Sequence, residues 1–162
     1  MPDLAFKAKV ILHHQAGLKE TRAMLLKNQV AATAGTRVDG DHRPANRGER
    51  GAVTAQGYLA HGIGQRIQTI DAALSSIEKI GTGPRDVVTT GALVEIALED
   101  EQRTFIILPG GGGQTVTIDQ HTVTIISANS PVARQLNGLQ IDEDGTLLIG
   151  ERSQDIEVTS LC

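Results

Sequence analysis

The sequence predicts an α+β protein, in which an antiparallel coiled-coil hairpin of two long helices precedes a small antiparallel-sheet domain with one short helix. Two long segments carry apolar residues at a seven-residue period, and the charged stretch Val38 to Ala52 separates them. After Gly81-Thr-Gly-Pro84 the pattern changes to short β-branched stretches. We therefore divide the chain into a hairpin, residues 1–83, and a second domain, residues 84–162.

The first helix is predicted from about Leu4 to Ala34, with Gly35 ending it. Charged side chains occupy the faces away from its apolar stripe, as expected of a helix that packs along one side. Gly17 is its weak point, at a cost of about 1 kcal/mol relative to alanine. The stripe consists of Leu4, Ile11, Leu18, Leu25 and Ala32.

The second helix has a clearer heptad signal, with two seams. One seam consists of Val53, Ala60, Ile67 and Leu74, and the other of Gln56, Ile63, Ile70 and Ile77. The glycines, proline and charges of Val38 to Ala52 are not expected to continue a helix, so the chain must reverse there. Helices of roughly 30 residues make a hairpin roughly 45 Å long. Three glycines, Gly57, Gly62 and Gly64, are expected to pack closely against the first helix.

The second domain shows β-branched enrichment or period-two alternation in six stretches. These are Ala92 to Leu98, Arg103 to Leu108, Thr115 to Ile118, His121 to Ile126, Thr146 to Ile149 and Asp155 to Thr159. A short helix is predicted where Ser130 offers an N-cap oxygen, Pro131 suits the first helical position and Gly138 the stop. Gly110 to Gly113 lack the Lys and Ser or Thr that follow the glycines of a phosphate loop, so we expect a mobile hairpin loop there.

Composition excludes several functions. With two Phe, one Tyr and no Trp, the chain has almost no rings on which nucleic-acid bases could stack. Neighbouring positions on a helix point about 100° apart, so His13 and His14 cannot share a metal. The single Cys162 cannot form an internal disulfide. Since neither a membrane-length apolar run nor a signal-peptide pattern is present, we expect a cytoplasmic protein. The sequence also has no nucleophile-elbow pattern and no spacing that indicates a self-contained active site, so we expect a non-enzymatic protein.

Charge is divided unevenly along the chain. Residues 1–83 hold 11 Lys and Arg against 7 Asp and Glu, whereas residues 84–162 hold 4 against 12. The mildly basic hairpin favours contact with an acidic surface or a phosphate backbone, and the acidic second half would be repelled by nucleic acid. A stand-alone nucleic-acid binder is therefore disfavoured, and no sequence-specific DNA binding is expected.

Three stretches of sequence resemble one known family. The segment from Ile126 to Gly138, with Ser-Pro-Val-Ala-Arg-Gln-Leu-Asn-Gly at its end, resembles the Ser-Pro motif of the Gre transcript cleavage factors, the GreA and GreB family of bacterial transcription elongation proteins. Gly91-Ala-Leu-Val94 is similar to the first strand of that family's FKBP-like domain. Gly40-Asp41 and Gln56-Gly-Tyr58 are placed much as the family has Gly-Asp at its tip and Gln-Gly-Phe on the return helix.

This resemblance implies an accessory factor that docks on bacterial RNA polymerase and inserts its coiled-coil tip through the secondary channel. It places Ser130, Pro131 and Arg134 on the docking surface. At the tip, Asp41 matches the family's first acid, and Asp39 is a plausible second ligand, so that both would help to hold the Mg²⁺ of the polymerase. The factor would need no cofactor of its own, and arginines near the tip offer contacts to nascent or backtracked RNA.

The tip also departs from the family pattern. Pro44 stands where the family has a glutamate, and the loop is one residue longer than expected. Two functions of the resemblance therefore stay open: stimulation of transcript cleavage, or regulation without cleavage as a channel blocker or initiation modulator. A prolyl isomerase, suggested by the FKBP-like domain, is disfavoured because Phe105 is the only aromatic residue after residue 83.

Overall fold

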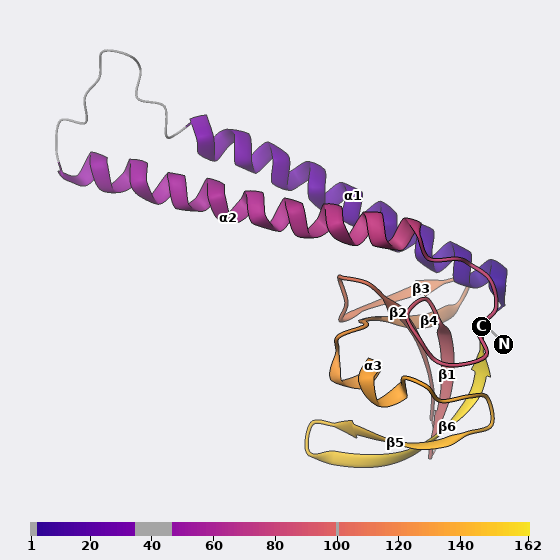
Figure 1. Cartoon of the computed structure of the whole chain (residues 1–162). Helices are drawn as coiled ribbons and strands as arrows, with labels where there is room; N and C mark the ends of the chain where they lie inside the picture. The colour runs from indigo at the N-terminus through magenta and orange to yellow at the C-terminus, as the bar shows by residue number, and fades with distance from the viewer. Residues whose placement is uncertain (1–2, 35–46, 100) are drawn as a thin grey trace. The chain divides into compact units, whose positions relative to one another are not determined.

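We describe residues 3–34, 47–99 and 101–162 in a computed structural model of the chain (Figure 1). Two long helices precede a six-stranded sheet with one short helix, and this confirms the predicted fold class. The helices are α1 (Leu4–Ala34), α2 (Arg47–Glu78) and α3 (Pro131–Leu136), and the strands are β1 (Leu93–Leu98), β2 (Glu101–Leu108), β3 (Gln114–Ile118), β4 (His121–Ser127), β5 (Asp144–Ile149) and β6 (Arg152–Leu161).

The chain forms two compact units, described separately below. One unit contains Ala16–Ala72, and the other contains Met1–Gln15 with Ala73–Cys162. The first turns of α1 and the last turns of α2 thus belong to the same unit as the sheet. Whether residues 1–83 and 84–162 fold as separate domains stays a prediction.

The observed bounds of α1 agree with those predicted, but α2 begins earlier than expected. Residues 47–52 are helical, so the expectation that the whole stretch from Val38 to Ala52 interrupts the helix is wrong. Arg47, Arg50 and Ala52 are good helix formers, and Glu49 lies in the first turn, where a carboxylate interacts favourably with the helix dipole. The two intervening glycines weaken this turn without breaking it.

In the helical unit, α1 and α2 pack through the predicted seams. Leu25 and Ala32 of α1 and Ile67 and Ile70 of α2 are buried. Beside this seam, Arg22 of α1 donates hydrogen bonds to both carboxylate oxygens of Asp71 of α2. The two helices therefore lie side by side and antiparallel within this unit. The seam position Gln56 is exposed, so it adds nothing to the packing.

Only one of the three glycines expected to pack closely does so. A Cβ added to Gly64 would lie 2.8 Å from Nε2 of Gln29, which itself donates a hydrogen bond to the carbonyl of Ala60. No described residue lies within 4 Å of a Cβ at Gly57 or Gly62, so the expectation is wrong for these two.

The sheet has the order β3-β4-β2-β1-β6-β5, and it is mixed rather than wholly antiparallel. All six predicted strands are present, but β2 and β4 run parallel, with Ile106 opposite Ile125. The prediction of an antiparallel sheet is wrong at this one pairing. The cause is that β4 inserts between β2 and β3, so the chain leaving β2 must cross the end of β4 to reach the sheet edge.

The glycine stretch after β2 makes this crossing, and it is not a hairpin loop as predicted. Gly110 to Gly113 all have positive φ values. A Cβ on Gly112 would lie 2.8 Å from the backbone nitrogen of Ser127, and one on Gly110 would lie 2.8 Å from Cβ of Ala73. Gly113 N–H donates a hydrogen bond to Ile125 O at 2.8 Å. Glycine suits all four positions because of their positive φ values, and Gly112 also because it passes close to the backbone of Ser127.

Both faces of the sheet are covered by residues of the compact unit to which the sheet belongs. On one face, Ala133 and Leu136 of α3 join a core cluster with strand residues such as Phe105 and Ile107. The alternate residues, for example Ile106, are also buried and face the other side. The first turns of α1 and the last turns of α2 cover that side. There the rings of Phe6 and His121 meet edge-on, with 5.4 Å between their centroids, and Ala73 approaches Gly110.

Candidate functional site

The predicted docking residues lie at the start of α3, and the local geometry is the one the sequence specifies. Ser130 is extended, with φ −67° and ψ 152°, and its Oγ accepts a hydrogen bond from Ala133 N at 3.1 Å. Pro131 follows at the first helical position, where its missing N–H is not needed. After the helix, Gly138 has φ +92°, a left-handed conformation that suits glycine. The predicted short helix is therefore confirmed.

One side of α3 is buried in the core, so only the residues on its other side are exposed at the surface. Ala133 is 2% exposed and Leu136 is fully buried, whereas Pro131 and Arg134 are exposed. Arg134 makes no ion pair with any residue that the structure describes. Because residues 84–162 hold few cations, an exposed guanidinium on a short rigid helix is a distinct feature of this acidic half of the chain.

Gln135 holds α3 to the edge of the sheet, a role that no sequence pattern indicated. Its side-chain nitrogen donates a hydrogen bond to Pro131 O at 3.1 Å, and its side-chain oxygen accepts one from Leu148 N of β5 at 2.6 Å. We call Ser130, Pro131, Arg134, Gln135 and Leu148 the α3 surface. No motif could have revealed Gln135, because its partner lies 13 residues further along the chain.

The predicted metal ligands of the tip, Asp39 and Asp41, lie outside the described residues, as do Pro44 and the arginines 37 and 43. Their approach to Mg²⁺ stays a prediction. Among the residues that the structure does describe, no three His, Cys, Asp or Glu side chains are grouped so that they could hold a metal ion. Arg47 and Arg50, at the start of α2, are exposed.

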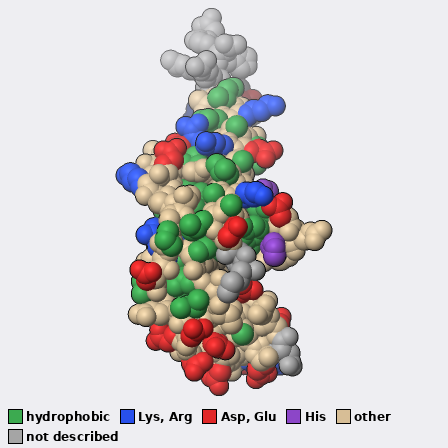
Figure 2. Space-filling view, turned by 90° about the vertical axis from the view of Figure 1, so that its right-hand side faces the viewer, with side chains coloured by type: hydrophobic (Ala, Val, Ile, Leu, Met, Phe, Trp, Pro, Cys, Tyr) green, Lys and Arg blue, Asp and Glu red, His purple; other side chains and the backbone are tan. Residues whose placement is uncertain are grey.

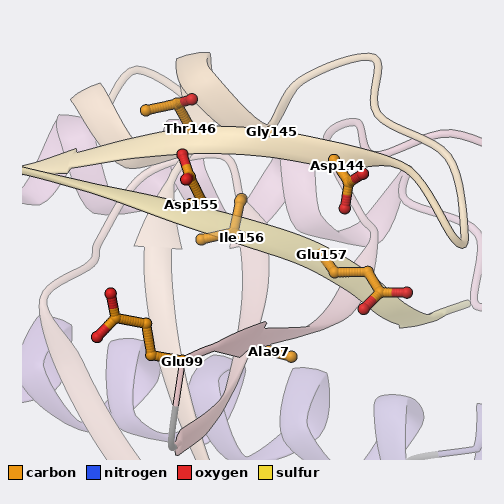
Figure 3. Close-up of a pocket in the computed structure, with 8 residues that line it drawn as sticks. All are labelled: Ala97, Glu99, Asp144, Gly145, Thr146, Asp155, Ile156 and Glu157. Atoms are coloured by element: carbon orange, nitrogen blue, oxygen red, sulfur yellow. The ribbon is translucent and has the colours of Figure 1, made fainter.

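A hollow on the sheet is lined by carboxylates that the sequence reasoning did not single out (Figure 3). It has a volume of about 610 Å³, and its lining residues are Ala97, Glu99, Asp144, Gly145, Thr146, Asp155, Ile156 and Glu157. The alternation of Asp155, Ile156 and Glu157 along β6 was the available signal, since alternate residues share a face. No aromatic ring lines the hollow, and Phe105 lies in the core. A prolyl isomerase pocket walled by rings is therefore not found here.

Two buried polar side chains lie on the part of α1 that belongs to the sheet unit. Lys7 is fully buried and donates a hydrogen bond from Nζ to Gly83 O at 2.8 Å, and burial lowers the pKa of its ammonium group. His14 is 3% exposed and lies against Gly111, and its Nε2 has no hydrogen-bond partner among the described residues. Burial lowers the pKa of His14, although a hydrogen bond to the backbone of Gly110 opposes the shift.

The face of the molecule seen in Figure 2 agrees with the predicted division of charge. Figure 2 shows Lys and Arg side chains gathered over the helices and Asp and Glu side chains gathered over the sheet. None of the described helices combines the length and the apolar character that crossing a membrane requires.

Comparison with known proteins gave structural likenesses only. No protein-family model and no curated protein matches the chain. The GreA factor homolog 1 (Gfh1) of Thermus thermophilus is similar to it over 91% of this chain and 94% of that one, with 16% identity and a TM-score of 0.37. Gfh1 of Thermus aquaticus is similar over 96% of this chain and 93% of that one, with 17% identity and a TM-score of 0.39. A GreA/GreB elongation factor from Nitrosomonas europaea is similar over 67% of this chain and 91% of that one, with 16% identity and a TM-score of 0.35.

Proposed function

We propose that this protein binds bacterial RNA polymerase and regulates transcription elongation by inserting the tip of its helical hairpin into the secondary channel. It is an accessory factor, and the Mg²⁺ on which it acts belongs to the polymerase. The observation that carries the proposal is the Gre-like segment from Ile126 to Gly138 in a sheet domain on the same chain as two paired long helices.

The helices support this proposal by their length. They contain 31 and 32 residues, which corresponds to about 45 Å each. Hairpin helices of that length can carry a group deep into a partner, and the buried seam with the Arg22–Asp71 pair keeps them together. Asp39 and Asp41, in the segment that joins the two helices, are the groups proposed to act on the metal, because Mg²⁺ prefers hard oxygen ligands.

The α3 surface supports the docking part of the proposal. The Ser130 cap, Pro131 and the clamp by Gln135 fix the backbone of this helix, so Arg134 projects from a preorganised site. Such an exposed arginine can pair bidentately with a carboxylate of a partner. Docking by the sheet domain would leave the hairpin tip available for the channel.

The presence of Pro44 in place of the second tip acid favours one further candidate, a Gre-like regulator that occupies the channel without stimulating cleavage. Purified protein added to backtracked polymerase complexes distinguishes the two. Shortened transcripts indicate cleavage stimulation. If this protein instead inhibits the cleavage that a known Gre factor stimulates, it occupies the channel without stimulating cleavage itself. Absence of both effects and of polymerase binding would refute the proposed function.

Asp41→Asn tests the tip chemistry, because it keeps the size of the side chain and removes its charge. We expect the variant to bind polymerase normally and to lose its effect on transcript cleavage or on other polymerase activity by about tenfold or more, as a lost metal ligand should. Transcript length is measured in the backtracked complex. If Asp41→Asn retains every effect, the tip acts by obstruction and not through the metal.

Arg134→Glu tests the docking surface. We expect polymerase affinity to fall about tenfold or more, because a carboxylate would replace the cation that faces the partner. Arg152→Glu is the matched control, since Arg152 is also exposed and lies on the sheet unit outside the α3 surface. Affinity is measured by competition with a labelled Gre factor. Equal losses in the two variants would indicate a general charge effect and remove α3 from the interface.

A further inference from the structure

The free edge of β3 is unlike the other edge of the sheet. β3 and β5 are the two end strands. At the β5 edge, Asp144 adds a charge, and the backbone N–H of Leu148 already donates a hydrogen bond to the side chain of Gln135. The stretch from Gly110 to Ile118 contains no charged residue and no proline, so β3 lacks the usual devices that prevent an edge strand from pairing.

The hairpin turn determines which backbone groups β3 presents at this edge. Asp119 and Gln120 form a two-residue turn with φ values of 48° and 67°, typical of a type I′ turn. Such a turn closes on a hydrogen-bonded pair, here Ile118 and His121. Because the pattern alternates, Thr115 and Thr117 direct their N–H and C=O groups away from β4, toward the free edge. Both threonines are exposed, and among the described residues no backbone group outside the sheet pairing bonds to theirs.

Threonine pairs already join β3 to β4. The hydroxyl oxygens of Thr115 and Thr124 are 3.2 Å apart, as are those of Thr117 and Thr122. Such cross-strand pairs stabilise neighbouring strands. The turn is also fixed to α1, because Lys9 forms an ion pair with Asp119, which compensates the charge nearest the strand.

We propose that β3 is a self-association edge, at which two copies of this chain pair their β3 strands antiparallel about a two-fold axis at Val116. In this register Thr115 of one copy lies opposite Thr117 of the other, and both residues direct their backbone groups away from β4. The arrangement forms four backbone hydrogen bonds and repeats the threonine pairing seen between β3 and β4.

A second copy fits this edge because an uncharged strand can face itself without like-charge repulsion. The remainder of the sheet domain is acidic, with 12 Asp and Glu against 4 Lys and Arg in residues 84–162. Screening of that repulsion by salt should therefore strengthen self-association. Association driven by the opposite charges of the hairpin and the sheet domain would instead weaken as salt rises. The salt dependence therefore distinguishes pairing of the β3 edges from association through opposite charges.

Analytical ultracentrifugation of the full chain over a wide concentration range tests the proposal. We expect reversible dimers that tighten with salt, and a dimer dissociation constant raised about tenfold or more by Thr117→Lys, since lysine blocks edge pairing. Thr146→Lys on β5 is the matched control, being an exposed threonine on the opposite edge strand, and should leave the constant unchanged. A monomer at every concentration, an equal effect of both variants, or association that weakens with salt would overturn the proposal.

A crosslink provides a second test that does not depend on the lysine variant folding. In the proposed register the two Val116 residues form a non-hydrogen-bonded pair, with a Cα separation of about 4.5 Å that a disulfide can span. Val116→Cys combined with Cys162→Ser should give a covalent dimer on diamide oxidation, whereas Thr146→Cys with Cys162→Ser should not. Failure of the first variant to crosslink, or equal crosslinking of both, refutes the register.

Discussion

Replacing Gly112 with alanine is expected to lower the free energy of unfolding by about 3 kcal/mol, because two costs combine. The residue has φ +143°, a conformation that side chains disfavour. In addition, the new Cβ would lie 2.8 Å from the backbone nitrogen of Ser127 and 3.4 Å from the carbonyl carbon of Ile126. Both neighbours belong to the backbone, so they cannot move aside without disturbing β4 where it pairs with β2.

Gly113→Ala is the matched control for this prediction. Gly113 also has a positive φ, of +78°, but no atom of the described part of the chain lies within 4 Å of the added Cβ. Only the conformational cost remains, about 1 kcal/mol. Urea denaturation followed by circular dichroism measures both variants. Equal losses of stability would contradict the close crossing of the glycine chain over β4.

Acidification is expected to destabilise the protein through His14. Burial lowers the pKa of this histidine in the folded protein, so the unfolded chain, with a pKa near 6.5, binds the proton more readily. The stability that neutral His14 contributes is therefore complete above about pH 6.5. It is lost as the pH falls toward the folded pKa, by up to about 1.4 kcal/mol per pH unit. The ring has little room to adapt, since it packs against Gly111.

Comparison with His14→Gln isolates this effect from the titration of the carboxylates. The free energy of unfolding of both proteins is measured by urea denaturation between pH 8 and pH 5. We expect the advantage of the wild type to shrink as the pH falls, because glutamine does not titrate. A constant difference between wild type and His14→Gln would contradict the prediction.

Local patterns were sufficient for most of the secondary structure. The apolar heptads predicted α1 from Leu4 to Ala34, because packing of one helix face requires that period. β-branched alternation located all six strands, and Ser130 with Pro131 located α3, since a helix start depends on a few adjacent residues. The resemblance to Gre factors, also read from short motifs, supplied the function proposed here.

Contacts between distant residues were decided only by the tertiary structure. Strand order is not encoded in the alternation of β2, β3 and β4, so the parallel pairing and the crossing role of Gly112 were not predicted. The clamp of Gln135 on Leu148 and the burial of His14 against Gly111 likewise join residues that no local motif connects. The physical reason is that a periodic pattern specifies which face of an element is buried, while the element that covers this face is chosen by packing of the whole chain.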